Sequence, residues 1–252
     1  MFGWIPTPVQ YKRNVYLGSR ALKSAMIPDT LDLRSDLPPV RDQGVQSSCV
    51  AMAGAAMKEW QEKHDIGYNL YFSPQFIYNS RTNYPSEGMY LPDLMDILTN
   101  KGVCQEYMLP YGSIANPSKI TKEMLQDAYN FKIKSYAEIP YGSDISKVKT
   151  ALADNGPCVI SFPVYNTGPD FWNRKYGDQY LGGHAVLIVG YTRNAFIIRN
   201  SWGTGWNDGG YTLYPFEEYN VMKHREIWTT VDDKSIYVEP KAEDKQCKCT
   251  II

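Results

Sequence analysis

One cysteine at the predicted start of a helix is the first residue whose type and position suggest chemistry. Cys49 follows Ser47 and Ser48 in the stretch QGVQSSCVAM, and an alanine-rich segment begins directly after it. The first turn of a helix carries unpaired backbone N–H groups and a partial positive charge, which favour a thiolate over a thiol. Because the thiolate is the reactive form of cysteine, Cys49 is a candidate nucleophile.

A histidine and two side-chain amides are the partners that such a nucleophile needs. The stretches HAVLIVGY and AFIIRNSW predict an antiparallel hairpin, and a turn centred on Thr192 places His184 opposite Asn200 on one face. The imidazole can then stabilise the thiolate and protonate a leaving amine, and the asparagine fixes the ring. Gln43 lies six residues before Cys49 and can donate to an oxyanion, beside the backbone N–H of Cys49. Together these residues predict acyl transfer.

The elements that must position these residues separate into a helical first half and a strand-rich second half. Periodicity and capping residues predict helices over 47–64, 73–81, 91–102, 118–131 and 144–156. In the first helix, apolar residues such as Val50 and Trp60 form one stripe, charged residues such as Lys58 and Glu59 occupy the other side, and Ser47 or Ser48 is the cap. Strands are predicted over 131–139, 158–164, 184–191, 195–202 and 209–216.

This order predicts an α+β protein with a cleft between two lobes. We expect an N-terminal extension over 1–31 and a mainly helical lobe with Cys49 over 32–130. A mainly β lobe with His184 and Asn200 follows over 131–238, and a polar C-terminal tail over 239–252.

Composition excludes several classes of function. A net charge of −1 and the lack of a long basic cluster before the C-terminus argue against nucleic-acid binding. The N-terminus lacks the apolar core of a signal peptide and no apolar run approaches the roughly 20 residues of a membrane span, so we expect a cytoplasmic protein. Five cysteines without a repeating spacing indicate neither a disulfide framework nor a zinc site, and no metal or organic cofactor is implied.

At three motifs the sequence resembles the papain family of cysteine peptidases. The motifs are DQGVQSSCVA around Cys49, GGHAVLIVGY around His184 and IIRNSWGTGWNDGGY around Asn200. They occur in the family's order, and His184 follows Cys49 by 135 residues, within the roughly 130 to 150 typical of papain-like enzymes. The resemblance covers most of residues 32–215. It implies a papain-like two-lobed fold, with a helical lobe, an antiparallel sheet or barrel lobe and the active-site cleft between them.

The resemblance also implies a role for each matching residue. Cys49 is the nucleophile, His184 the acid and base, Asn200 the residue that orients the histidine, and Gln43 the oxyanion donor. Trp202 shields the bond between His184 and Asn200 from water.

Two glycines are implied to bind substrate. Gly88 matches a glycine that lets the substrate backbone approach, and Gly183 directly precedes the histidine. Other residues have an ordinary structural interpretation: we expect Trp206, Cys104 and Cys158 in the core and His64 and His224 on the surface.

The sequence departs from the family at three places. Val50 stands where the family usually has tryptophan, and Gln46 where secreted members have a disulfide cysteine, which agrees with a reducing compartment. The residues before position 32 resemble the short N-terminal extension of some bacterial and large-virus members more than a long helical propeptide. They either lie over the cleft as an inhibitor, as in a zymogen, or pack on the back.

The last four residues, from Cys249, have the form of a prenylation signal. Thr250 and Ile252 make the match imperfect, so the alternative is a polar tail with exposed thiols at Cys247 and Cys249. Prenylation would attach the protein to a membrane and would imply contact with eukaryotic prenyltransferases.

The sequence therefore predicts a monomeric thiol peptidase with a peptide or protein substrate. One alternative is a different acyl transfer on the same triad. The other is a catalytically silent papain-like binding module, against which the retention of all four polar groups argues.

Overall fold

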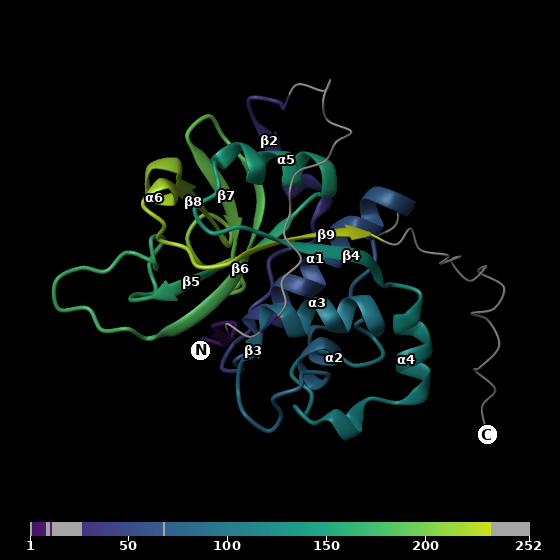
Figure 1. The fold of residues 1–252 in the computed structure, drawn as a ribbon. Coiled ribbons are helices and arrows are strands. Elements are labelled where there is room, and N and C mark those ends of the chain that lie inside the picture. The colour runs from purple at the N-terminus through teal and green to yellow at the C-terminus, as the bar shows by residue number, and fades with distance from the viewer. Residues whose placement is uncertain (1, 9–10, 12–26, 68, 233–252) are drawn as a thin grey trace, which may run out of the picture.

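A long helix, α1 (Cys49–Ile66), stands between a group of shorter helices and an antiparallel sheet (Figure 1). The computed structural model describes residues 2–8, 11, 27–67 and 69–232. The other helices in these residues are α2 (Pro74–Asn79), α3 (Leu91–Asn100), α4 (Lys122–Tyr129), α5 (Ile145–Asn155) and α6 (Phe216–Asn220), with 3-10 turns at Arg34–Asp36 and Pro117–Lys119. In Figure 1, α2, α3 and α4 lie together in the lower half and the sheet occupies the upper half. This is the predicted two-lobed α+β arrangement.

The sheet follows the strand order β4-β9-β5-β6-β7-β8, and β2 pairs with β6 away from this path. Every pair in it is antiparallel. The bounds are β2 (Leu31–Asp32), β4 (Ile133–Ile139), β5 (Cys158–Val164), β6 (Gly182–Tyr191), β7 (Ala195–Arg199), β8 (Tyr211–Pro215) and β9 (Ile227–Asp232). Strand β9 was not among the predicted strands, although its residues, IWTTVD, are mainly β-branched and aromatic.

Two hydrophobic clusters cover the two faces of the sheet. Successive residues of a strand point to opposite faces, so Leu187 and Val189 of β6 join the cluster around α1, whereas Val186 and Ile188 join the cluster that contains residues of α5. All seven residues of β5 are buried, which explains its nearly continuous apolar sequence.

The hairpin of β6 and β7 differs in register from the prediction. Leu187 pairs with Arg199 where a turn centred on Thr192 would pair it with Ile197, and the register shifts again between Ile188 and Tyr191. The turn therefore centres nearer Arg193 and Asn194, and Asn200 does not pair with His184 across the ladder. An irregularity of this kind moves every later residue of a strand, which sequence spacing does not reveal.

Helix α1 is buried on both sides, and the prediction of a charged side did not foresee this burial. The carboxylates of Glu59 and Glu62 and the ammonium of Lys58 are almost completely excluded from solvent. Lys58 pairs with Glu62 at 2.8 Å and with Asp232 at the end of β9, and Glu59 pairs with Arg41. Buried charges require such partners, and these come from distant parts of the chain.

His224 is buried, so its predicted surface position was wrong. Its Nδ1 lies 3.0 Å from the hydroxyl of Tyr214, and its ring stacks on Tyr219 with 4.6 Å between centroids. Burial lowers the pKa of His224 to about 4. His64 is exposed, and Cys104 and Cys158 are buried free thiols, as predicted.

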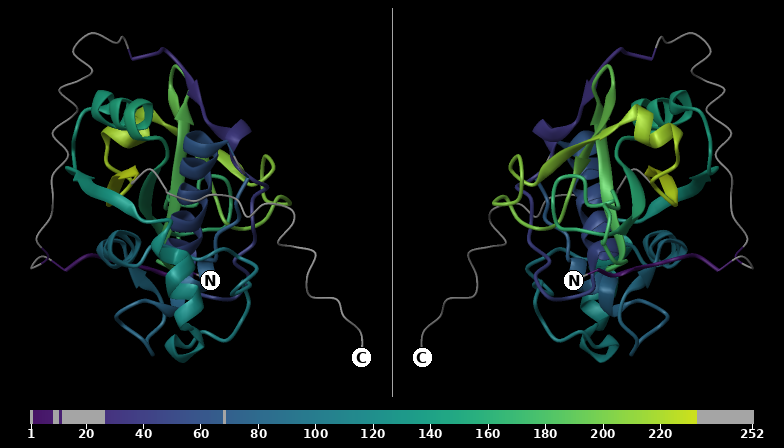
Figure 2. Two further views of the ribbon diagram at one scale, coloured as in Figure 1. Left: turned by 90° about the vertical axis from the view of Figure 1, so that its right-hand side faces the viewer. Right: turned by 90° about the vertical axis from the view of Figure 1, so that its left-hand side faces the viewer.

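The N-terminal residues cross the molecule between the helices and the sheet. Strand β1 (Trp4–Ile5) pairs in parallel with β3 (Met89–Tyr90), directly before α3. In Figure 2 this segment, in purple, passes between the two halves of the fold in both views. Residues 2–8, called here the N-terminal segment, therefore occupy the junction at which β6 and α1 also begin.

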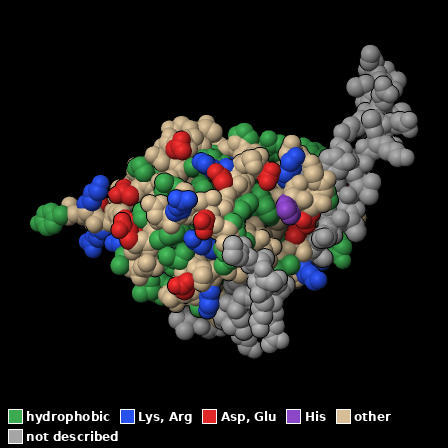
Figure 3. Space-filling view, turned by 90° about the horizontal axis from the view of Figure 1, so that it is seen from above, with side chains coloured by type: hydrophobic (Ala, Val, Ile, Leu, Met, Phe, Trp, Pro, Cys, Tyr) green, Lys and Arg blue, Asp and Glu red, His purple; other side chains and the backbone are tan. Residues whose placement is uncertain are grey.

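Positive and negative side chains alternate over the face seen in Figure 3, without a large patch of one sign. The loop between β5 and β6 projects to the left in Figures 1 and 3. Within the described residues, no helix combines the length and the apolar character needed to cross a membrane.

Candidate active site

Cys49 begins α1, and its sulfur lies against β6. The backbone N–H of Ala185 donates to Sγ at 3.4 Å, and the residue is completely buried. Burial raises the pKa of the Cys49 thiol, and the backbone N–H groups of Ala185, Gly3, Val50 and Trp4 oppose this effect. The position at the start of a helix therefore does not by itself make Cys49 a thiolate while the sulfur is excluded from water.

His184 lies in β6, one residue before the backbone N–H that contacts Cys49. Its Nε2 lies 2.7 Å from Oδ1 of Asn200, and Oδ1 also accepts the backbone N–H of Ser201 at 2.8 Å. An amide oxygen accepts, so these two contacts assign the ring proton to Nε2 and leave Nδ1 with a lone pair. Nδ1 is buried and has no hydrogen-bond partner among the described residues.

Burial also sets the charge of the histidine. It lowers the pKa of His184 to about 4, and the hydrogen bond to Asn200 opposes the shift. At neutral pH the ring in this arrangement is therefore an uncharged base with an unused lone pair.

Aromatic rings surround the pair formed by His184 and Asn200. Trp202 stacks on the imidazole with 4.8 Å between centroids and 21° between planes, and Trp206 meets Trp202 edge-on at 5.2 Å. Phe171 approaches His184 at 5.5 Å. These rings keep water from the bond between His184 and Asn200, which strengthens that bond.

Gln43 is buried beside the segment that follows β7. Its Oε1 accepts the hydroxyl of Ser201 at 2.7 Å, and its Nε2 donates to the carbonyl of Gln46 at 3.0 Å. The backbone N–H of Gln43 donates to the carbonyl of Ser201 at 2.9 Å. The structure thus places Gln43 next to the residue that follows Asn200.

Tyr111 contacts two residues of the segment that leads into the nucleophile, Gln43 and Ser48, and was not foreseen from the sequence. Its hydroxyl donates to the carbonyl of Gln43 at 2.8 Å and lies 2.5 Å from Oγ of Ser48, the N-cap residue of α1. Because a phenol has one proton, the Ser48 hydroxyl donates in the second contact. The Ser48 side chain makes no capping hydrogen bond to α1. No local motif marks Tyr111, because its partners are more than sixty residues away.

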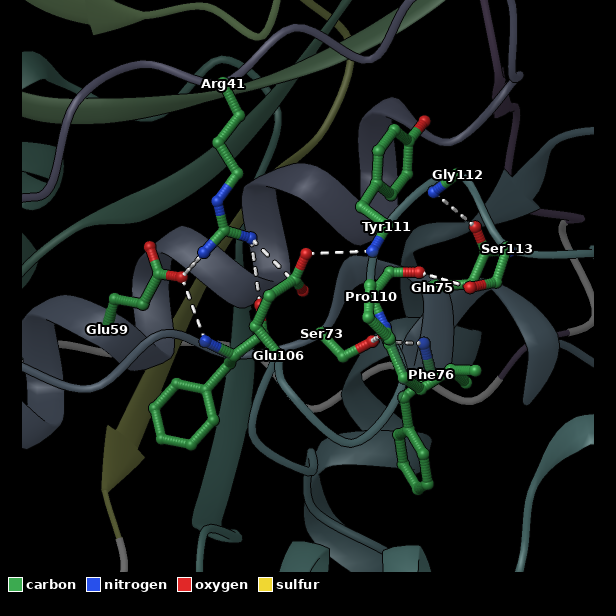
Figure 4. A network of polar contacts seen from close by, with 12 residues as sticks. Arg41, Glu59, Ser73, Gln75, Phe76, Glu106, Pro110, Tyr111, Gly112 and Ser113 are labelled. Atoms are coloured by element: carbon green, nitrogen blue, oxygen red, sulfur yellow. Dashed lines mark hydrogen bonds and ion pairs between the residues drawn. The ribbon is translucent and has the colours of Figure 1, made fainter.

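A polar network fixes the backbone of Tyr111 (Figure 4). The backbone N–H of Tyr111 donates to Glu106 at 2.8 Å, and Glu106 lies 3.9 Å from the guanidinium of Arg41. Arg41 also pairs with Glu59 of α1. Burial raises the pKa of Glu59 to about 7, against the effect of Arg41. The network connects α1 with the loop that contains Tyr111.

The N-terminal segment covers the two candidate substrate-binding glycines. A Cβ on Gly88 would lie 2.8 Å from the carbonyl oxygen of Gly3, and one on Gly183 would lie 2.4 Å from that of Trp4. The backbone N–H of Met89 donates to the carbonyl of Gly3 at 2.7 Å. Met89, which was not predicted as a site residue, is thus the residue that hydrogen-bonds a chain running beside Gly88.

The segment also reaches the catalytic candidates themselves. A Cβ on Gly3 would lie 2.0 Å from the carbonyl oxygen of Ser47, so only glycine fits at this position. The ring of Phe2 meets His184 edge-on at 6.2 Å between centroids. Both Cys49 and His184 are completely excluded from solvent. Within the described residues, no group of three or more His, Cys, Asp or Glu side chains is placed to hold a metal ion.

Comparison with known proteins identifies the family. The family model described as "Papain family cysteine protease" matches residues 27–229, and the chain belongs to this family. Cysteine proteinase 3 of Entamoeba histolytica is 30% identical over 214 residues, which are 80% of this chain and 66% of that protein. Cathepsin K of Mus musculus is 32% identical over 208 residues, which are 77% and 62% of the two chains. The chain thus spans slightly less than two thirds of these two relatives.

Solved structures agree with this assignment. Xylellain, a cysteine protease from Xylella fastidiosa, superimposes with a TM-score of 0.78 at 28% identity, over 92% of this chain and 96% of that one. ProCathepsin B S9 from Trypanosoma congolense, at 18% identity, shows the same fold with a TM-score of 0.72, over 92% and 87%.

Proposed function

We propose that this protein is a cysteine peptidase that hydrolyses peptide bonds through Cys49. The observation that carries the proposal is the pair formed by His184 and Asn200, held at 2.7 Å next to the backbone that contacts the Cys49 sulfur at 3.4 Å. This arrangement supports the roles of nucleophile for Cys49, base for His184 and orienting residue for Asn200. Membership of the papain family agrees with it.

The reaction follows from the roles of these side chains. His184 Nδ1 takes the thiol proton, and Cys49 Sγ attacks the peptide carbonyl carbon to form a C–S bond. The oxyanion accepts hydrogen bonds from the side-chain amide of Gln43 and the backbone N–H of Cys49. The imidazolium protonates the amine as the C–N bond breaks, and a water molecule deprotonated by His184 then hydrolyses the thioester.

We further propose that the N-terminal segment inhibits this site in the intact chain. Three features support the proposal: the segment takes the hydrogen bond of Met89, fills the space beside Gly183 and buries Cys49 and His184. A substrate needs the same positions, so the segment must leave before hydrolysis begins.

Two further proposals concern the cellular compartment of the protein and the lipidation of its C-terminal tail. We propose that the protein works in a reducing compartment, which the free thiols of Cys49, Cys104 and Cys158 support. Prenylation at Cys249 rests on the sequence motif alone and lies outside the described residues. Mass spectrometry of the protein expressed in a eukaryotic cell tests it, because the lipid adds a fixed mass to Cys249 and not to a Cys249→Ser variant.

Hydrolysis of a fluorogenic peptide library tests the main proposal. We expect the full-length chain to cleave slowly, a Cys49→Ala variant not to cleave, and a Cys104→Ala variant to match the parent, because Cys104 is a buried thiol away from the site. Mass spectrometry after treatment with a peptidyl electrophile should find the label on Cys49. A correctly folded chain that is unreactive at Cys49, even with the N-terminal segment displaced, would favour the binding-module alternative.

A further inference from the structure

A pocket of about 550 Å³ lies near the C-terminal end of α1, away from the catalytic candidates. Its walls come from β2 and the 3-10 turn after it, the second half of α1, the end of α5 and the end of β9. Cys49 and His64, which lines the pocket, belong to the same helix, whose rise of 1.5 Å per residue separates them by about 22 Å. None of the described residues that line the pocket belongs to the proposed catalytic site, so a ligand bound here would leave the cleft unoccupied.

The pocket combines acidic side chains with apolar walls. Four aspartates line it: Asp36, Asp65, Asp154 and Asp232. Neither lysine nor arginine occurs among the lining residues that the structure describes. The buried residues Trp60 and Leu152 contribute apolar surface, and the exposed imidazole of His64 stacks on Trp60 with 4.8 Å between centroids. Apolar walls between carboxylates favour a positive charge that is carried by an aliphatic chain.

Two buried side chains of the pocket wall each keep an oxygen atom without a hydrogen-bond donor. The side chain of Asp232 is only 9% exposed, and its Oδ1 accepts from Lys58. Its Oδ2 has no hydrogen-bond partner among the described residues. Gln61 is also buried, and its Nε2 donates to Thr230 at 2.9 Å, whereas its Oε1 has no partner within the same residues. Buried acceptors without donors are costly, so this wall favours a ligand with N–H donors.

Lys58 only partly compensates the negative charge behind this wall. Its ammonium is shared between Asp232 and Glu62, so two carboxylates have one cation between them. Burial raises the pKa of Asp232 to about 6 against the effect of Lys58, and the charges of Glu62 and Asp65 act in the same direction as burial. An additional cation in the pocket would therefore stabilise the ionised form of Asp232.

The spacing of the carboxylates distinguishes an organic ligand from a metal ion. The four aspartates come from four different elements, and within the described residues no three His, Cys, Asp or Glu side chains are placed to hold a metal ion. Separate carboxylates match separate ammonium groups, and the volume is that of a small-molecule site. We propose that this pocket binds an organic cation with two or more ammonium groups on aliphatic chains, supplied by a free polyamine or by neighbouring lysine side chains of a peptide. The proposal does not depend on peptide hydrolysis.

Calorimetric titration of the full-length Cys49→Ala chain, which cannot turn over, tests the pocket. The probes are 1,5-diaminopentane and an acetylated, amidated Lys-Lys dipeptide, and the comparisons are 1-aminopentane and calcium. We expect saturable binding of the two-ammonium probes at low ionic strength, and binding of 1-aminopentane about 2- to 5-fold weaker because one ion pair is lost. The probe with the lower Kd identifies the source of the ammonium groups. Calcium should not displace either probe; displacement by equimolar calcium, or no saturable binding of either probe, would overturn the proposal.

Paired substitutions and one histidine signal locate the binding. Asp65→Asn/Asp154→Asn removes two exposed carboxylates of the pocket and leaves the buried Lys58 with its partners, so Kd for the tighter probe should rise about 3- to 20-fold. The control Asp96→Asn/Asp208→Asn changes the net charge equally at exposed residues that do not line the pocket, and it should keep the parent Kd.

The NMR signal of the His64 imidazole, assigned with His64→Gln, should shift on titration, whereas the signals of His184 and His224 should not. An equal loss of affinity in both pairs of substitutions, or a His64 signal that does not move at saturation, would overturn the pocket.

Discussion

The hydroxyl of Ser201 donates to Oε1 of Gln43 at 2.7 Å, and the preceding residue, Asn200, contacts Nε2 of His184 at the same distance. Two consecutive residues after β7 therefore hold the oxyanion candidate and the catalytic base candidate. The two lobes meet through these contacts, because Gln43 precedes α1 and Ser201 follows the sheet strand β7. The relative position of donor and base depends on this one segment.

Removing the Ser201 hydroxyl should weaken turnover more than binding. In Ser201→Ala the side-chain amide of Gln43 would keep its N–H donors. Its Oε1 would lose the hydrogen bond from the Ser201 hydroxyl that fixes the plane of the amide. We expect Ser201→Ala to lower kcat about tenfold and to change KM less than about threefold, a fraction of the loss when an oxyanion donor is removed entirely. Steady-state kinetics measures both values. Ser201→Thr retains the hydroxyl and should recover most of kcat; an equal loss in both variants would contradict the positioning role.

A side chain at Gly3 should displace the N-terminal segment. A Cβ at this position would lie 2.0 Å from the carbonyl oxygen of Ser47, a contact that neither backbone can accommodate. In the Gly3→Leu variant we therefore expect Cys49 to react with a peptidyl electrophile at least about tenfold faster than in the parent chain, because the opening equilibrium shifts by more than about 1.4 kcal/mol. The measurement is the second-order rate of Cys49 labelling at fixed pH.

Gly205→Leu provides the control for this substitution. A Cβ at Gly205 meets no atom within 4 Å, so the same side chain is added without a clash. The labelling rate of the control should equal that of the parent. Unchanged labelling in Gly3→Leu would show that the segment does not limit access to Cys49.

Acidic pH should open the blocked site. Burial lowers the pKa of His184 from 6.5 to about 4, and Phe2 of the segment is one of the rings that cover it. Departure of the segment exposes the ring to water, so the open form binds a proton more tightly than the blocked form. The contribution of His184 to the stability of the blocked form is complete above pH 6.5 and is lost as the pH falls toward 4. The interval of about 2.5 pH units corresponds to about 3 kcal/mol, or at most a few hundredfold in the opening equilibrium.

Hydrogen exchange of the Met89 amide reports this opening, because it donates to Gly3 only in the blocked form. After correction for the intrinsic exchange rate, we expect protection to decrease between pH 6.5 and 4. In His184→Gln, which cannot bind the proton, this decrease should disappear. The same pH dependence in the variant would assign the effect to another group, such as buried His224.

The sequence predicted the catalytic candidates because each belongs to a short motif at the boundary of an element. Cys49, His184 and Asn200 follow local signals: the start of an alanine-rich helix, an apolar strand and a glycine-rich turn, although the predicted serine cap forms no side-chain capping hydrogen bond. The register that connected His184 to Asn200 was wrong, since the turn centres near Arg193 and the strands carry an irregularity. Asn200 still reaches the histidine because β7 ends at Arg199 and the chain then turns toward the site.

Features that depend on distant partners could not be predicted. The burial of Lys58 requires Asp232 at the far end of the chain, and the burial of His224 involves the ring of Tyr141, which lies 5.6 Å from it between centroids. The place of the N-terminal segment likewise depends on a tight fit between Gly3 and Ser47, which no periodicity records. An inhibitory position over the cleft was one of the two predicted options for the N-terminal residues, and the path of residues 2–8 supports it.

Tyr111 provides the last test, because it joins Gln43 to Ser48, the residue directly before Cys49. Its hydroxyl donates to the carbonyl of Gln43 and accepts from the hydroxyl of Ser48. The Tyr111→Phe substitution therefore leaves two partly buried polar groups without their shared hydrogen-bond partner. We expect a loss of about 1 to 2 kcal/mol in the free energy of unfolding and a roughly tenfold lower kcat with nearly unchanged KM.

Tyr107→Phe is the matched control, since Tyr107 is 74% exposed and lies four residues earlier in the same loop. It should leave both quantities unchanged. Thermal unfolding measures the contribution of Tyr111 to stability. Steady-state kinetics, measured well below the melting temperature, measure its contribution to turnover. A lower melting temperature with normal kcat would make Tyr111 a purely structural residue. A lower kcat in a fully folded variant would establish that its hydroxyl positions Gln43 and the start of α1 for the reaction.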